Sequence, residues 1–123
     1  MIEICEVGPR DGLQTEKTIL STEDKITLIE KLIDSGLKKI EVTSFVNAKI
    51  VPQMSDAEQL IEHLPLVEDV IYTGLLLSRS GLERALATKL THYNVVLAVS
   101  NTFNLKNVKK SVEQSLHELT ALI

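Results

Sequence analysis

The fold is decided by residues 21–43, which read STEDKITLIEKLIDSGLKKIEVT. The polar start at 21–24 is typical of a helix N-terminus. Apolar residues then recur at the three- and four-residue spacing of one helix face: Ile26, Ile29, Leu32 and Ile33. Ser35-Gly36 supplies a left-handed stop, and residues 39–43 predict a short strand. The stretch therefore predicts an amphipathic helix followed by a buried strand.

The same alternation extends toward both ends of the chain. Residues 2–7 predict an earlier strand that ends at Gly8-Pro9, so a long loop separates it from the helix that begins near residue 21. After the strand at 39–43, a loop runs through Pro52, and Ser55 with Glu58 three residues later predicts a second helix that begins with a capping box.

Two more units follow. A strand over 70–77 leads into a helix that we expect Ser80 and Glu83 to cap, and residues 94–99 (NVVLAV) predict a fourth strand. The final helix carries a single apolar stripe: Val108, Val112, Leu116, Leu119 and Ile123. Since no stop signal interrupts this stripe, we expect the chain to end inside its last helix.

Strands that alternate with helices define the α/β class, in which parallel strands pair through right-handed crossovers. Two architectures fit: an open doubly wound sheet, or a closed barrel of eight such units that needs about 250 residues. Periodicity alone does not separate them. Residues 1–123 contain no linker or shift in composition, so they are predicted to lie in one domain.

Composition excludes several classes of function. With 44% apolar and 24% charged residues, the chain is typical of a soluble globular domain. Thirteen basic against seventeen acidic residues give a net charge of −4, which disfavours nucleic acid as a partner. No apolar run reaches the length of about 20 residues that crosses a bilayer, and the start of the chain lacks the pattern of a signal peptide, so we expect no membrane partner and a cytoplasmic location.

Neither the cysteine nor the histidines predict a metal or redox site. Cys5 is the single cysteine and cannot form an internal disulfide, so we interpret it as a small buried strand residue. His63, His92 and His117 lie in unrelated segments. A metal site needs several convergent ligands, so we interpret them as two helix residues and one residue at the start of a strand.

Charged residues cluster instead in the first two units. Arg10 and Asp11 follow the first strand in the sequence GPRDGLQ, at the strand end where both α/β architectures place their active sites. Glu6 and Glu41 lie within predicted strands, and burying a carboxylate costs several kcal/mol unless it is paired. Arg10 is the nearest cation by topology, so we predict a polar pocket on an apolar scaffold.

These residues also carry a resemblance to a known family. The segments EVGPRDGLQ (6–14), IEVTSFV (40–46) and VPQM (51–54) resemble hydroxymethylglutaryl-CoA lyases in sequence, order and spacing. Residues 100–107 resemble the matching family loop more loosely. Isopropylmalate synthase and the carboxyltransferase part of pyruvate carboxylase, which belong to the wider superfamily, usually have Thr-Leu or Thr-Phe in place of the Gly-Pro before the Arg-Asp pair. Gly8-Pro9 therefore favours the lyase branch.

The resemblance implies a TIM-type (β/α)8 barrel, of which residues 1–123 would form the amino-terminal part, about the first four β-α units. It implies cleavage of hydroxymethylglutaryl-CoA, an acyl-CoA, to acetyl-CoA and acetoacetate in leucine degradation, with Mg²⁺ or Mn²⁺ as cofactor. By resemblance Asp11 is a metal ligand, Arg10 binds the substrate and stabilises the developing enolate oxygen, and Glu41 holds Arg10 in the catalytic site. Three further residues are weaker candidates, the first two for substrate binding and the third for support of the pocket: Gln14, Ser44 and Glu6.

The match is incomplete. The family completes its metal site with a His-x-His pair and an Asn, and its catalysis with a Cys-bearing loop, and residues 1–123 contain none of these. We therefore expect this chain alone to lack appreciable lyase activity. Thr15 and Asn101 also depart from the family pattern, which leaves a related lyase acting on another hydroxyacyl-CoA as an alternative.

Two functions of other classes compete with the lyase. One is a non-catalytic half-barrel, a remnant or an assembly subunit, that self-associates through its unpaired sheet edges. The other is a flavodoxin-like binding domain, which would need a phosphate-binding loop that the sequence does not show.

Overall fold

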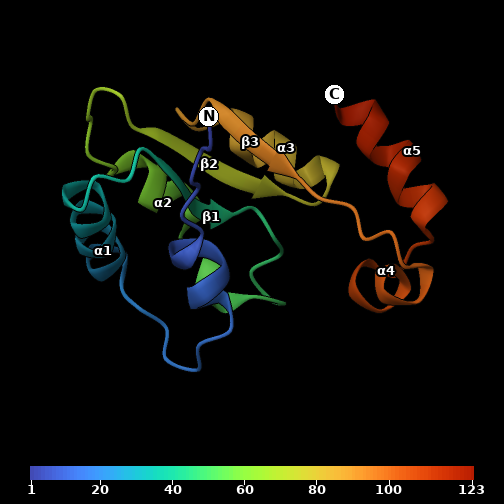
Figure 1. Ribbon diagram of the computed structural model, residues 1–123. Coiled ribbons are helices and arrows are strands. Elements are labelled where there is room, and N and C mark those ends of the chain that lie inside the picture. Colours follow the sequence, from blue (N-terminus) through green and yellow to red (C-terminus); the bar gives the residue numbers. More distant parts are fainter.

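The computed structural model describes all residues, 1–123. A single π-helical turn (η1, Gly8–Gly12) precedes helix α1 (Thr22–Asp34) and strand β1 (Lys39–Ser44). The remaining elements follow in chain order: the 3₁₀ turn η2 (Pro52–Met54), α2 (Ala57–Glu62), β2 (Ile71–Leu76), α3 (Arg79–Leu86), β3 (His92–Val95), α4 (Asn101–Val108) and α5 (Val112–Leu122). Figure 1 shows α4 and α5 to one side of the sheet, beyond the end of β3. No helix is long and apolar enough to cross a membrane.

The three strands form one parallel sheet in the order β1-β2-β3. Glu41 pairs with Thr73 across β1 and β2, and Leu75 pairs with Asn94 across β2 and β3. On the other side of β1, Glu6 adds a single parallel bridge to Ile40. The predicted α/β class and parallel pairing are confirmed.

The apolar core lies between the sheet and the helices α1, α2 and α3. Its residues come from the strands and from all three helices: Ile29, Ile40, Val42, Phe45, Ala57, Leu60, Ile61, Leu64, Leu76, Ala85 and Leu90. Glu41 and Thr73 alternate with these core residues along β1 and β2, so they belong to the other face of the sheet. Helices on one face and polar side chains on the other are the arrangement of a barrel wall, whereas a doubly wound sheet carries helices on both faces.

Helix α1 confirms the prediction for residues 21–34. The Ser21 side chain caps the helix by accepting a hydrogen bond from the Asp24 amide at 3.1 Å. Gly36 ends it with φ of +97°, a left-handed conformation that only glycine adopts without strain. The Leu37 amide then reaches back to the Leu32 carbonyl at 3.3 Å and closes the helix end.

The strand predicted at residues 2–7 is reduced to one bridge. The Glu6 amide donates to the Lys39 carbonyl at 2.9 Å, and the Glu6 carbonyl accepts from the Glu41 amide at 2.8 Å. In this parallel register, Ile2 and Ile4 lie opposite the turn that closes α1, where no extended chain is available to pair with them. Both are consequently exposed.

Two predicted helix starts are wrong, the first by one residue and the second by two. We expected Ser55 and Glu58 to cap α2, but its N-cap is Asp56, and the side chains of Asp56 and Glu58 instead bind partners on other elements. We expected Ser80 to cap α3, but Ser78 does so by accepting from the Gly81 amide at 3.1 Å. In α2 the two acidic side chains make tertiary contacts instead of a capping box, and in α3 an earlier serine caps the helix.

The prediction for the last unit is corrected twice. Strand β3 covers 92–95 rather than 94–99, because β2 ends at Leu76, opposite Val95, and offers no partner beyond it. The final helix is not continuous: Lys109 takes a left-handed φ of 57° after α4, and Ser111 starts α5 with a capping box. The predicted stripe is therefore broken, and Leu116 and Ile123 are exposed.

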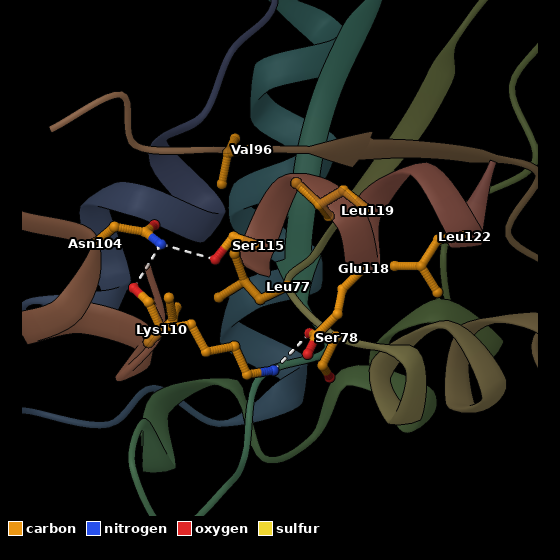
Figure 2. A pocket seen from close by; sticks show the side chains of 10 residues that line it. Leu77, Ser78, Val96, Asn104, Lys110, Ser115, Glu118, Leu119 and Leu122 are labelled. Carbon is orange, nitrogen blue, oxygen red and sulfur yellow. Dashed lines mark hydrogen bonds and ion pairs between the residues drawn. The ribbon is translucent and has the colours of Figure 1, made fainter. Parts of the chain in front are cut away.

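The buried side chain of Asn104 joins α4 to α5. Its amide donates to the carbonyls of Lys110 and Ser111 at 2.9 and 3.1 Å and to Ser115 Oγ at 2.7 Å. Figure 2 shows this junction from the cavity beside it. The cavity has a volume of about 30 Å³, space for about one water molecule. Its size excludes a substrate pocket.

An ion pair on the helical side of the sheet ties α2 to α3. Arg84 donates from Nε and Nη2 to the two Glu58 oxygens at 2.6 and 3.0 Å, and from Nη1 to the Val46 carbonyl at 3.1 Å. The hydrogen bonds from Arg84 hold the pKa of Glu58 below its usual value of 4.5.

A depressed pKa makes the stabilising effect of Glu58 dependent on pH. It is fully present above about pH 4.5 and is lost as the pH falls through the lower pKa of the folded state. We expect Glu58→Gln to reduce the urea midpoint at pH 7 and to reduce it less at an acidic pH well below 4.5, where the stabilising effect of Glu58 is being lost. Because both side chains are more than a third exposed, the difference at pH 7 should stay below about 1 kcal/mol. A difference that is the same at both pH values would contradict this expectation.

Candidate functional site

The π-helical turn η1 presents Arg10 and Asp11 at the carboxyl end of the first β segment. The Arg10 and Asp11 amides both donate to the Val7 carbonyl, at 3.1 and 2.7 Å. The Glu6 carboxylate accepts from the Gly8 amide at 2.6 Å, and a Cβ on Gly8 would come within 2.8 Å of that carboxylate oxygen. Single π-helical turns are rare, and they occur frequently at functional sites.

Four side chains on the polar face of the sheet form a connected network, here called the Glu41 cluster: Arg10, Glu41, Thr73 and Asn94. Glu41 is only 3% exposed. Arg10 Nε donates to its Oε1, Asn94 Nδ2 donates to its Oε2, and Asn94 Nδ2 also donates to Thr73 Oγ1 at 3.1 Å. The sequence prediction that a buried Glu41 pairs with Arg10 is therefore confirmed.

Arg10 also joins the cluster to the exposed Asp11. Arg10 Nη1 lies 2.9 Å from Asp11 Oδ1, and the Asp11 side chain is 64% exposed. The guanidinium thus binds one buried carboxylate through Nε and one exposed carboxylate through Nη1, while Nη2 has no hydrogen-bond partner within the chain. A cationic donor with a free N–H beside an accessible carboxylate can bind a negatively polarised oxygen.

The weaker candidates are less closely connected. Gln14 follows η1 and is half-buried, and its side chain makes no hydrogen bond within the chain. Ser44 ends β1 at 1% exposure, and its Oγ has no hydrogen-bond partner. Glu6 binds the Gly8 amide and not the Arg10 guanidinium. The structure therefore does not bring these three side chains into the Glu41 cluster.

Cys5 lies beside the cluster and is half-buried. Burial raises the pKa of its thiol and the charge of Glu41 raises it further, against smaller lowering effects of Lys39, the Glu41 backbone and Thr73. A raised pKa keeps the thiol protonated near neutral pH, where only the thiolate is an effective nucleophile. The raised pKa disfavours a catalytic role for Cys5, but the prediction of a buried strand residue is wrong, because Cys5 is half-buried and precedes the single bridge at Glu6.

The histidines lie away from the cluster. His63 follows α2, His92 begins β3, and His117 lies in α5. No three His, Cys, Asp or Glu side chains converge in a way that would hold a metal ion. Within this chain, Asp11 is the accessible carboxylate of the site.

Sequence reasoning missed Asn94 and Thr73. Asn94 begins the apolar strand predicted over 94–99, and Thr73 lies within the strand predicted over 70–77. The signal in the sequence is a polar side chain within each of two neighbouring predicted strands, because such groups require partners when they are buried. Their alignment with Glu41 depends on the pairing of three strands, which the sequence does not fix.

A second buried ion pair holds the loops next to the site. Lys25 of α1 is 2% exposed, and its Nζ donates to Asp56 Oδ1 at 2.6 Å and to the Gln53 carbonyl. Thr22 Oγ1 donates to the other Asp56 oxygen at 2.7 Å, and Gln53 Nε2 donates to the Glu16 carbonyl at 2.7 Å. This network connects the loop after β1 to the loop after η1.

Fold and site together define a class. The chain is part of a TIM-type β/α barrel: its parallel strands carry helices on one face, and Arg10 and Asp11 follow the first β segment. The family model described as HMGL-like matches residues 1–123. The chain belongs to the HMGL-like family, as its sequence motifs predict.

Individual relatives agree with this assignment. Hydroxymethylglutaryl-CoA lyase YngG of Bacillus subtilis is 43% identical over 118 residues, which are 96% of this chain and 40% of the relative. A crystal structure of the Bacillus subtilis HMG-CoA lyase superposes with a TM-score of 0.93 at 42% identity, covering 98% of this chain and 41% of that one. An HMG-CoA lyase from Acinetobacter baumannii, solved with coenzyme A and 3-methylmalate, gives 0.93 at 37% identity, covering 99% and 40%. The chain thus spans about two fifths of the relatives it matches, and corresponds to their amino-terminal part.

Proposed function

We propose that the chain is the part of a hydroxymethylglutaryl-CoA lyase that carries Arg10, Asp11 and Glu41, and that it takes part in cleaving hydroxymethylglutaryl-CoA to acetyl-CoA and acetoacetate. The observation that carries the proposal is the buried Arg10–Glu41 pair beside the exposed Asp11. It lies at the carboxyl ends of the strands, in a chain 43% identical to a lyase of that name. Leucine degradation and a cytoplasmic location belong to the same proposal.

The reaction requires two charge movements. A base removes the proton of the tertiary hydroxyl, that oxygen becomes the ketone of acetoacetate, and the electron pair of the breaking carbon-carbon bond moves onto the acetyl-CoA fragment as an enolate. Protonation of the enolate carbon then gives acetyl-CoA. Arg10 Nη2 is the free cationic donor that suits a developing enolate oxygen, and Glu41 holds the guanidinium in a fixed orientation for it.

The donor set of the site fits a hard divalent cation in part. Asp11 offers an exposed carboxylate, the ligand type that Mg²⁺ and Mn²⁺ prefer. When bound, such a cation would polarise substrate oxygens. One carboxylate makes a weak site by itself, so the remaining ligands would come from water, substrate or residues outside this chain. Gln14 and Ser44 remain predictions for substrate binding and Glu6 for support of the pocket.

The proposal is tested by grafting. We would replace the matched segment of the Bacillus subtilis lyase with residues 1–123 and measure acetoacetate release from hydroxymethylglutaryl-CoA with and without Mg²⁺. The chimaera is expected to be active only with the cation, whereas residues 1–123 alone should show no turnover. Arg10→Gln in the chimaera is expected to lower kcat by about 10²–10³, the effect of removing one donor to a developing oxyanion.

Arg79→Gln is the matched control, because Arg79 is 85% exposed and pairs only with Glu83, at 3.6 Å. It should leave kcat unchanged. A chimaera that unfolds cooperatively yet shows no cation-dependent cleavage would refute the proposal, as would an Arg10→Gln chimaera with full activity.

A non-catalytic, self-associating half-barrel is the second candidate. It is favoured by apolar side chains exposed near the two sheet edges: Ile2, Ile4, Val95, Val96 and Val99. Sedimentation of residues 1–123 as a monomer at high concentration would exclude this candidate. Dimers that bury these side chains, together with an inactive chimaera, would favour it over the lyase.

A further inference from the structure

The geometry points to Asn94 as a positioning residue that keeps one nitrogen of Arg10 free for a ligand, an inference that rests on the proposed function. Asn94 lies on β3, which β1 and β2 separate from the segment that carries Arg10. It does not contact Arg10 directly. It acts through Glu41: its Nδ2 donates to Glu41 Oε2, and Arg10 Nε donates to Oε1. Each oxygen of the carboxylate therefore has a donor from a different element.

The Glu58–Arg84 pair of the same chain shows how an arginine binds a carboxylate to which no asparagine amide donates. Glu58 has no asparagine beside it, and Arg84 binds it as a fork, with Nε on one oxygen at 2.6 Å and Nη2 on the other at 3.0 Å. This two-point geometry is the preferred one for arginine and a carboxylate. Arg10 binds Glu41 through Nε alone, and the other carboxylate oxygen, which Nη2 would reach in a fork, accepts from the Asn94 amide instead.

Glu41 fixes the direction of the amide, and Thr73 accepts its second hydrogen bond. Asn94 Nδ2 has two protons, and the second one goes to Thr73 Oγ1 at 3.1 Å. The reverse orientation of the amide would set its oxygen against the Glu41 carboxylate, which cannot donate a hydrogen bond. The amide therefore stays turned toward Glu41, and Arg10 keeps Nη2 unpaired on the accessible side of the cluster.

Loss of the amide has a definite consequence. Without a donor on Oε2, the Glu41 carboxylate would turn to bind both Nε and Nη2 of Arg10, as Glu58 does with Arg84. Nη2 of Arg10 would then donate to Glu41 and would no longer be free to donate to a substrate oxygen. A role in stability alone would leave the donor pattern of Arg10 unchanged.

The first test uses the Arg10 side-chain signals in ¹⁵N NMR spectra of residues 1–123, assigned with Arg10→Lys. In Asn94→Leu, which has nearly the same shape, the Nη2 protons of Arg10 are expected to become resolved and protected, like those of Arg84. Asn94→Ser, which is smaller and too short to reach Glu41, gives the same readout if the leucine variant fails to fold. Unchanged Arg10 signals in a folded variant overturn the inference. This readout needs no lyase activity, so it is independent of the proposed function.

Asn94→Asp adds a pH-dependent readout. The introduced carboxyl faces Glu41 of β1, with Arg10 and Cys5 as the other titratable groups nearby, and the like charge of Glu41 raises its pKa. When protonated it donates to Glu41 as the amide does. The Arg10 signals should therefore resemble those of Asn94→Leu at high pH and return to the original pattern as the pH falls. A pattern that does not respond to pH counts against a donor role for residue 94.

In the chimaeric lyase, Asn94→Leu is expected to lower kcat about tenfold to a hundredfold with little change in KM, since the lost donor acts on the developing charge. An unchanged kcat in an active chimaera overturns the catalytic part of the inference. If the chimaera with the original Asn94 is itself inactive, the proposed function fails, and the NMR result still decides how Arg10 is positioned.

Discussion

Glu41→Gln is expected to lower the free energy of unfolding by about 3 kcal/mol, the loss that follows when one partner of a buried ion pair is removed. The two Glu41 oxygens accept from Arg10 and Asn94, and a glutamine has only one acceptor oxygen. Its NH₂ group must therefore face a donor, either the guanidinium or the asparagine amide. Urea unfolding followed by circular dichroism at pH 7 measures the effect.

Glu58→Gln is the matched control for this experiment. Glu58 also accepts two hydrogen bonds, both from Arg84, but its side chain is 43% exposed, whereas that of Glu41 is 4% exposed. Water can solvate the exposed glutamine, so its cost should remain below about 1 kcal/mol. Equal losses in the free energy of unfolding at the two positions would show that the greater burial of Glu41 does not make its substitution more destabilising.

Lys25→Met should produce a second large loss, again about 3 kcal/mol, because it leaves Asp56 without its cation in the interior between α1 and α2. A double-mutant cycle with Asp56→Asn isolates the coupling between the two charges. We also expect faster proteolysis within residues 13–20, because Lys25 holds Gln53, and Gln53 binds the Glu16 carbonyl.

Lys39→Met is the control for Lys25→Met. Lys39 pairs with Glu3 at 3.1 Å, but the two side chains are 27% and 66% exposed, so a loss below about 1 kcal/mol is expected. If both substitutions cost the same, or if the cycle shows no coupling between Lys25 and Asp56, the buried network does not stabilise these loops.

The sequence predicted the parts of the fold that local signals determine. Helix α1 has its own cap, its own apolar face and its own glycine stop, so its limits were predicted correctly. The extent of β3 depends on where β2 ends, and the break before α5 depends on Lys109 taking a left-handed turn that Ser111 then caps. Neither depends on the residues of the segment alone.

In the candidate site too, some features follow from the local sequence and others depend on how the strands pair. A carboxylate within a buried strand must have a partner, so the pairing of Glu41 with Arg10 followed from electrostatics and topology. Asn94 joins the same carboxylate only because three strands pair in one particular register. The sequence therefore predicts that the Glu41 carboxylate has a cationic partner, but it does not predict that Asn94 is the second donor.

The bond between Glu6 and the Gly8 amide has a consequence for how this segment tolerates mutation. A side chain at position 8 would meet the Glu6 carboxylate, so Gly8→Ala must displace that carboxylate and break its hydrogen bond. Once Glu6 has been shortened, the same alanine displaces nothing. Positions 6 and 8 are thus epistatic: the effect of one substitution depends on the residue at the other, and acceptable changes at this turn will arise in pairs.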